Sequence, residues 1–259
     1  MSDYNYPENF DVFEGMTSIS ALIKSINELG SNRKIIKVLY DASRAKQKER
    51  ELKFLLHASK MLDFPLISVN SEEIDALCSG NTHGGIVALC TKRQFPDLNV
   101  NFLTKGNFFA LIDGIEDPYN FGYSVRSLYA AGVDGIVLPP RNWMDYSGTV
   151  ARSSAGTSEL ANICFSETLD AVKTFKEHGF QIVCAGIRNS ISVYDYDFTK
   201  PFLLVVGGEK RGISSKILEL ADSVIRIEYG REFMGSLPSA SAVSVIAFEA
   251  SRQIKLKTL

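Results

Sequence analysis

Residues 108–126 read FFALIDGIEDPYNFGYSVR, an apolar run followed by a polar loop and the beginning of a helix. A continuous apolar run that ends in a loop with Gly and Pro is typical of a strand buried on both faces. The same alternation of apolar strands and amphipathic helices continues toward the C-terminus. Further strands are predicted at residues 135–138, 162–165, 181–185, 202–206 and 224–227, and helices near residues 124–131, 167–178, 214–221 and 239–255. This pattern predicts an α/β fold with a mostly parallel sheet covered on both faces.

The region before this sheet, about residues 10–95, predicts a smaller α/β unit. Strands alternate there with helices, one of them short and acidic. The predicted strands are residues 35–40, 66–69 and 86–91, and the predicted helices are residues 16–29, 47–62 and a short one from residue 71. A polar stretch with a proline, residues 94–99, interrupts the pattern and is the predicted linker. We therefore expect two domains, residues 1–97 and residues 106–259.

Positive charge gathers in one part of the chain. The 259 residues carry a formal net charge of −2, yet residues 31–60 hold nine Lys and Arg residues against three acidic ones. Local positive charge on an otherwise acidic protein suits contact with a phosphate backbone. The alternative is a solvated helix face with ion pairs along the helix. The candidate phosphate contacts are Arg44, Lys46, Lys48 and Arg50.

Composition excludes several classes of protein. No run of 18 apolar residues exists, so we expect no membrane span. The first residues are polar and acidic, unlike a signal peptide, and the chain reads as cytoplasmic. The four cysteines lie far apart, which favours buried thiols over a zinc site or a disulfide framework. No group of His, Cys and acidic residues has the spacing of metal ligands, so no metal is predicted.

The loops after three predicted strands are the candidate site, because open α/β sheets bind ligands at the C-terminal ends of their strands. In the first loop, Asn120 and Arg126 are six residues apart and could face one cleft. An arginine there would supply a fork of donors suited to a phosphate or a sugar oxygen. The alternative is that Asn120 caps the helix and Arg126 pairs with an acid such as Asp113.

The second and third loops are ambiguous when each is considered alone. The second reads VVGGEKRGI, residues 205–213, where glycines let a ligand approach the backbone closely. It matches neither the P-loop spacing nor the dinucleotide fingerprint. The third reads IEYGREFMGSLPSASA, residues 227–242, and leads into a helix of small residues with Pro238 in its first turn. Tight internal packing would also explain that helix.

In combination and in this order, the three loops closely resemble the SpoU (TrmH-like) family of RNA ribose 2'-O-methyltransferases. The shared features are D-x-x-x-D-P-x-N-x-G-x-x-x-R, then Gly-Gly-Glu-x-x-Gly, then Ser-Leu before the small-residue helix. The segment ARSSAGT, residues 151–157, resembles the family's Ser-Ala-Gly stretch. The segments FEG, residues 13–15, and HGGIVA, residues 83–88, look like the small RNA-binding domain, similar to a ribosomal protein, that often precedes the catalytic one.

The resemblance implies a C-terminal SPOUT-like domain with a trefoil knot, which binds S-adenosylmethionine at the knot. It also implies a homodimer whose partner helps to complete the site, and makes the basic residues of the first domain RNA contacts. Matching positions assign Asn120, Arg126 and Glu209 to the active site. The corresponding cofactor-binding residues are Gly207, Gly208, Ile227, Ser236 and Leu237.

The third loop departs from the family, which usually reads Ile-Pro-Met and then Ser-Leu-Asn-Val-Ser. This chain reads IEY at residues 227–229 and SLPS at residues 236–239. Pro238 stands where the family has a second catalytic asparagine, and it offers no side-chain amide. The favoured hypothesis is an S-adenosylmethionine-dependent methyltransferase acting on a ribose 2'-OH, in rRNA rather than tRNA. The first alternative is an RNA-binding protein of the same fold with lost or weak catalysis. The second is a small-molecule enzyme that uses a nucleotide cofactor on an unknotted sheet.

Overall fold

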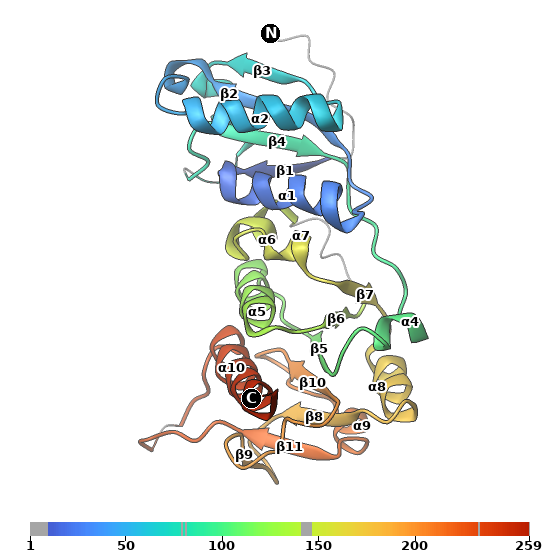
Figure 1. Cartoon of the computed structure of the whole chain (residues 1–259). Coiled ribbons are helices and arrows are strands. Elements are labelled where there is room, and N and C mark those ends of the chain that lie inside the picture. The colour runs from blue at the N-terminus through green and yellow to red at the C-terminus, as the bar shows by residue number, and fades with distance from the viewer. Residues whose placement is uncertain (1–9, 79, 81, 141–146, 233, 259) are drawn as a thin grey trace. The chain divides into compact units, whose positions relative to one another are not determined.

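The computed structural model describes residues 10–78, 80, 82–140, 147–232 and 234–258. The chain forms two compact units. The first unit comprises Met1–Gln94 and Trp143–Leu160, and the second comprises Phe95–Asn142 and Ala161–Leu259. Figure 1 shows the elements of both, and each unit is considered by itself below.

The first unit is built on a four-stranded sheet in the order β1-β4-β2-β3. Strands β2 and β3 are parallel and the other pairs are antiparallel. The strands are β1 (Asp11–Glu14), β2 (Ile35–Asp41), β3 (Leu66–Val69) and β4 (Ile86–Cys90). The helices are α1 (Gly15–Leu29), η1 (Ala42–Arg44), α2 (Glu49–Leu62) and α3 (Ser71–Leu77). All predicted elements of this region are confirmed to within two residues at each end, whereas β1 and η1 were not predicted.

Helix α1 shows how the sequence produces these elements. Ile19, Leu22 and Ile23 recur at helical spacing and are buried in the core of this unit. The helix ends at Gly30, whose φ of 68° is the left-handed conformation that favours glycine. Its apolar stripe therefore packs on the sheet, and its first turn lies where β1 ends.

The first unit also contains α6 (Ser147–Ser153) and α7 (Thr157–Leu160). The expected division into residues 1–97 and 106–259 placed this segment in the second domain, whereas it is part of the first unit. A buried ion-pair cluster explains why it folds there. The guanidinium of Arg33 pairs with Glu159 of α7 at 2.9 Å and with Asp11 of β1 at 2.6 Å. Arg152 of α6 pairs with Glu14 at 2.7 Å.

The second unit is a seven-stranded sheet in the order β7-β6-β5-β10-β8-β11-β9, and every pair in it is parallel. The strands are β5 (Phe108–Asp113), β6 (Gly135–Leu138), β7 (Ile163–Phe165), β8 (Gln181–Ala185), β9 (Ile191–Ser192), β10 (Phe202–Gly207) and β11 (Ser223–Arg226). The helices are α4 (Val100–Leu103), α5 (Pro118–Ala131), α8 (Thr168–Glu177), α9 (Ser215–Leu218) and α10 (Ser239–Thr258). The predicted α/β fold with a parallel sheet is confirmed.

Helices cover both faces of this sheet, with α5 and α10 on one side and α8 on the other (Figure 1). Alternate strand residues such as Phe109 and Leu203 form one core with Phe175 of α8. Cys164 and Cys184 are part of that core, and burial raises the pKa of both thiols to about 12. The prediction of buried thiols is confirmed for these two residues and for Cys90, whereas Cys78 is only half-buried.

The strand order places the candidate loops together. Strands β5 and β10 are neighbours in register, so that Gly207 lies opposite Asp113. The chain leaves β5 toward β6 and β7, whereas β8, β11 and β9 lie beyond β10. Ligand sites of open α/β sheets form at such a switch point, where the strand order reverses.

The trefoil knot expected in this unit stays a prediction from the resemblance. Among the described residues, no helix is long and apolar enough to cross a membrane.

Candidate functional site

A cavity of about 870 Å³ opens at the C-terminal ends of β10, β8 and β11. The walls of this switch-point cavity include all five residues predicted to bind the cofactor, namely Gly207, Gly208, Ile227, Ser236 and Leu237. Glu209 lines it as well. The structure thus brings together residues that lie up to 30 positions apart in the sequence.

Two of the glycines are required by close backbone contacts. A Cβ atom on Gly208 would lie 1.8 Å from the carbonyl oxygen of Gly114, and one on Gly207 would lie 2.5 Å from the carbonyl carbon of Gly212. The loop closes on itself through a hydrogen bond from the N–H of Gly212 to the carbonyl of Gly208 at 2.9 Å. The loop after β10 therefore lies directly against the loop after β5.

Replacing Gly208 with alanine is expected to disrupt this packing. Because the opposing atoms are backbone, the Gly208→Ala variant should lose about 1–3 kcal/mol of the free energy of unfolding. It should also bind S-adenosylhomocysteine more weakly, as calorimetry would measure. Gly230→Ala is the matched control, since a Cβ there meets nothing within 4 Å. Equal binding and stability in both variants would contradict this role for Gly208.

Glu209 joins three elements at the edge of the cavity. Its Oε1 atom accepts hydrogen bonds from the Asn120 side-chain amide at 3.2 Å and from the backbone N–H of Ser239 at 3.2 Å. Asn120 belongs to α5 and Ser239 begins α10. Two of the three predicted active-site residues, Asn120 and Glu209, are therefore in direct contact.

Asn120 is not the helix cap that the alternative hypothesis required. Helix α5 begins at Pro118, six residues before the predicted start, and the carboxylate of Asp117 caps it by accepting from the N–H of Asn120 at 2.8 Å. Aspartate followed by proline is a common beginning for a helix. The side chain of Asn120 is consequently available to Glu209.

Arg126 lies apart from Asn120. The two residues are six positions apart on α5, which separates them by about 120° around the helix. Arg126 is exposed and does not line the switch-point cavity. Among the described residues it has no ion pair, so the alternative in which it pairs with Asp113 is wrong. The expectation that Asn120 and Arg126 face one cleft stays a prediction.

Sequence reasoning missed Tyr229 as a site residue. Its hydroxyl accepts a hydrogen bond from the backbone N–H of Leu237 at 3.1 Å, and both residues line the cavity. This hydrogen bond ties the loop after β11 to the segment that precedes α10. The signal was the departure from the family's Ile-Pro-Met at residues 227–229, but nothing in the sequence pairs Tyr229 with Leu237.

The four candidate phosphate contacts lie in the first unit around the start of α2. Lys46 and Arg50 are exposed. Arg44 pairs with Asp41 at 3.3 Å, and Lys48 pairs with Glu51 at 3.0 Å. The exposed cations suit contact with a phosphate backbone, and the two local ion pairs suit a solvated helix face. Both interpretations of this segment therefore find support. We call residues 44–50 the basic turn.

Comparisons with known proteins show the family. The model of the SpoU rRNA Methylase family matches residues 107–248, and that of the RNA 2'-O ribose methyltransferase substrate-binding domain matches residues 14–96. The chain belongs to the SpoU rRNA methylase family. The resemblance stated from the sequence is confirmed, as is the expectation of an RNA methyltransferase fold preceded by a substrate-binding domain.

Similar proteins and solved structures match most of this SpoU protein, and the structures show the same fold. A Staphylococcus saprophyticus protein, provisionally named a TrmH family tRNA/rRNA methyltransferase, is 28% identical over 229 residues, covering 86% of this chain and 90% of that one. The structure of an AdoMet-bound rRNA methyltransferase from Sinorhizobium meliloti has a TM-score of 0.77 at 22% identity, covering 95% and 88% of the two chains. An RNA 2'-O ribose methyltransferase has a TM-score of 0.79 at 19% identity, covering 97% and 90%.

Proposed function

We propose that this SpoU protein transfers a methyl group from S-adenosylmethionine to a ribose 2'-OH of RNA, with rRNA favoured over tRNA. The observation that carries the proposal is the switch-point cavity, whose walls hold the five predicted cofactor residues beside the hydrogen bond between Asn120 and Glu209. Family membership argues against the alternative of a small-molecule enzyme on an unknotted sheet.

The cavity fits S-adenosylmethionine in volume and lining. Its volume of about 870 Å³ lies within the usual range of small-molecule sites, about 300–1,000 Å³. Ile213, Leu218 and Ile246 offer apolar contacts suited to an adenine ring. Gly207 and Gly208 leave backbone without side chains, which suits close approach by a ligand. The cofactor supplies the methyl group.

The protein groups beside the cavity would orient the acceptor. The Glu209 carboxylate uses Oε1 for both of its hydrogen bonds, and Oε2 has none among the described residues. A ribose hydroxyl could donate to such an oxygen while Asn120 and Ser239 hold the carboxylate in place. Fixed alignment of the hydroxyl with the methyl group can supply much of the rate.

Arg126 would complete the site from a second copy of the chain. It lies on α5 close to the exposed side chains of Tyr123 and Tyr129, and α5 packs beside α10, where Phe248 is 51% exposed. The hydroxyls of Ser127 and Ser244 hold the two helices together at 2.7 Å. An exposed aromatic face on two adjacent helices suits a homodimer interface. In that homodimer, Arg126 of one protomer would reach the cavity of its partner.

Mixing two defective variants tests this arrangement. Arg126→Ala and Gly208→Ala subunits, each strongly impaired alone, should regain part of the activity when they are exchanged into one dimer, because a hybrid holds one intact site. Sedimentation should show a dimer for the unmodified protein. A monomeric protein, or a mixture no more active than its components, would contradict the shared site.

Charge reversal in the basic turn should weaken RNA binding. Changing Lys46, Lys48 and Arg50 to glutamate should lower the affinity and flatten its dependence on salt, by about 0.7–0.9 units of slope for each phosphate that the protein no longer binds. Binding of S-adenosylhomocysteine, which occupies the second unit, should be unchanged. An unchanged salt slope would instead support a solvated helix face.

Pro238 favours a second candidate, an RNA-binding protein with lost or weak catalysis. Pro238 is exposed, and its carbonyl accepts from the N–H groups of Ser241 and Ala242 at the start of α10. It therefore contributes to the helix start rather than a side-chain amide to the site. This candidate predicts RNA affinity that survives Arg126→Ala, and no methyl transfer at any cofactor concentration.

Labelled S-adenosylmethionine and total RNA separate the two candidates. The RNA should come from cells that lack this protein, so that its target is unmethylated. We expect label in rRNA and none in tRNA. Label in no class of RNA, despite measurable RNA binding, would favour the second candidate.

A further inference from the structure

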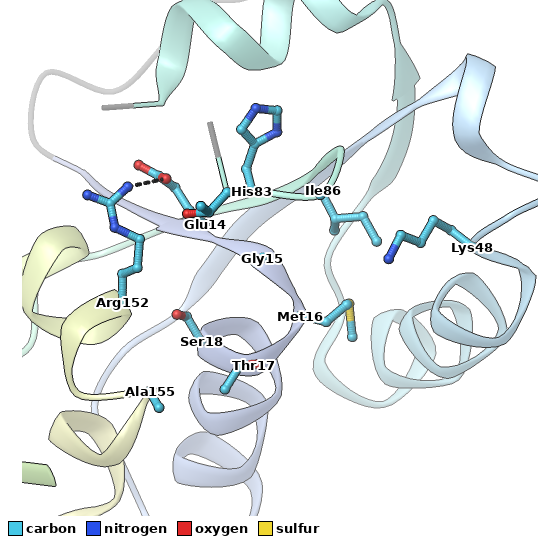
Figure 2. A pocket seen from close by; sticks show the side chains of 12 residues that line it. Glu14, Gly15, Met16, Thr17, Ser18, Lys48, His83, Ile86, Arg152 and Ala155 are labelled. Carbon is cyan, nitrogen blue, oxygen red and sulfur yellow. Dashed lines mark hydrogen bonds and ion pairs between the residues drawn. The ribbon is translucent and has the colours of Figure 1, made fainter. Parts of the chain in front are cut away.

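A second cavity lies within the first unit, at the N-terminus of α1 (Figure 2). Its volume is about 370 Å³, and residues 14–18 form one of its walls. The loop 82–84, Lys48 of the basic turn, and Arg152 and Ala155 of the α6–α7 segment form the rest. We call it the N-terminal pocket. It is separate from the switch-point cavity and shares no residue with it.

The backbone of α1 offers hydrogen-bond donors to this pocket. The first N–H groups of a helix have no partner within it, and they carry the positive end of the helix dipole. Glu14 occupies the capping position, but its side chain makes no capping hydrogen bond. Its carboxylate pairs instead with Arg152 at 2.7 Å, as Figure 2 shows. The donors of Gly15, Met16 and Thr17 therefore remain without a side-chain cap.

Ser18 supplies an independent observation. Its side chain is buried, with 3% exposed, and its hydroxyl makes no hydrogen bond to any described residue. The residue lines the pocket, and in Figure 2 the hydroxyl points into the space below Glu14 and Arg152. Because buried hydroxyls nearly always have a partner, an unpaired one facing a cavity indicates a missing polar ligand.

The charge of the lining indicates the chemistry of that ligand. Glu14 is the single carboxylate among the lining residues, against the two cations Lys48 and Arg152. Together with the dipole of a 15-residue helix, this balance favours an anion. Lys48 extends the pocket to the basic turn, with its Nζ atom beside the loop at Gly84.

The α6–α7 segment is packed tightly against α1 at this pocket. Ala155 has a φ of 51°, a left-handed conformation that alanine rarely adopts. A Cβ on the next residue, Gly156, would lie 2.4 Å from the Cβ of Ala21. Strained backbone of this kind persists only where the surrounding structure holds it, and it gathers at functional sites.

We propose that the N-terminal pocket binds a phosphate group of the RNA substrate, seated on the first turn of α1 and the Ser18 hydroxyl. The inference rests on the RNA binding in the proposed function, and not on catalysis. It assigns a ligand-binding role to Arg152 and Ala155, which lie outside the segment matched by the substrate-binding model. RNA that crosses the basic turn would place one phosphate in the pocket, near Lys48.

Two charge-introducing variants and two matched controls test the proposal. Ser18→Asp places a carboxylate in the pocket, and Lys48→Glu reverses a charge at its rim. Ser20→Asp, on the same helix, and Lys53→Glu, on α2 with its side chain 74% exposed, lie outside the lining. Filter binding would use radiolabelled rRNA fragments from cells that lack this protein, at several salt concentrations.

We expect each pocket variant to lose about tenfold or more in RNA affinity and about one unit of salt slope. The controls should bind as the unmodified protein does. Melting temperature and S-adenosylhomocysteine binding show that each variant is folded, and Lys48→Glu at the partly exposed rim keeps the test valid should Ser18→Asp fail to fold. Pocket variants that bind rRNA like their controls would overturn the proposal.

A direct titration identifies the source of the phosphate. Inorganic phosphate added to the ¹⁵N-labelled full-length protein should shift the amide signals of Gly15, Met16 and Thr17, and rRNA fragments should shift the same signals. Shifts with inorganic phosphate but not with RNA would identify a free-anion site and overturn the assignment to RNA. Absence of methyl transfer, with these shifts and affinities intact, would reject the proposed catalysis alone.

Discussion

Arg126→Ala is expected to reduce methyl transfer by about 10²–10³-fold, the usual effect of removing one preorganised charge donor. Arg126 is exposed and has no ion pair among the described residues, so its charge is available to an incoming phosphate or a developing alkoxide. A guanidinium serves as a hydrogen-bond donor and a positive charge rather than as a general base. The measurement is single-turnover transfer with saturating cofactor.

The same variant should keep its melting temperature nearly unchanged, because an exposed side chain without an ion pair contributes little to the folded state. Arg126→Lys should restore little activity, since an ammonium group cannot reproduce the guanidinium fork. Asn120→Ala, which removes a hydrogen bond to Glu209, should also slow transfer. Normal turnover in Arg126→Ala would reject the catalytic role.

Arg33→Met is expected to lower the free energy of unfolding by about 3–5 kcal/mol, because it leaves buried carboxylates without a partner. Arg33 is 3% exposed and forms two hydrogen bonds to Glu159, at 2.9 and 3.2 Å, and one to Asp11, at 2.6 Å. Burial by itself lowers the pKa of Arg33, but the carboxylates of Glu159 and Asp11 outweigh it and raise the pKa overall.

Chemical denaturation would measure this decrease in stability. Lys34→Met is the matched control, since it removes a neighbouring exposed cation and should change stability little. Arg33→Lys should lie between the two, because one ammonium group cannot satisfy both carboxylates in the same geometry. A decrease in Arg33→Met no larger than in Lys34→Met would show that the cluster does not hold α7 in the first unit.

Most strands were predicted from the sequence, because runs of apolar residues such as those of β5, β8 and β10 identify them. The two-residue strand β9 was missed because Ile191 and Ser192 form no such run. β1 was missed since DVFE, residues 11–14, contains only two apolar residues in a row. The placement of α6 and α7 could not be predicted, because it depends on a pair, Arg33 and Glu159, that lies 126 residues apart. No local pattern records an interaction of that range.

The candidate site likewise combines features that local sequence predicts with features that depend on long-range contacts. Six residues that line the switch-point cavity, the five cofactor residues and Glu209, were predicted from ordered motifs, and the strand order then brings those motifs together. Arg126 was expected beside Asn120 because both belong to one motif, but the helical repeat turns them to different sides of α5. Tyr229 and the unpaired hydroxyl of Ser18 depend on tertiary packing, which the sequence does not record.

The position of the transferred methyl group tests the central claim most directly. The protein would be incubated with methyl-deuterated S-adenosylmethionine and rRNA from cells that lack it, and the RNA digested to nucleosides for mass spectrometry. A 2'-O-methyltransferase places the deuterated methyl group on the ribose fragment of one nucleoside, and this is the result that we predict. A deuterated methyl group on a base fragment, or none in any nucleoside although the RNA is bound, would contradict it.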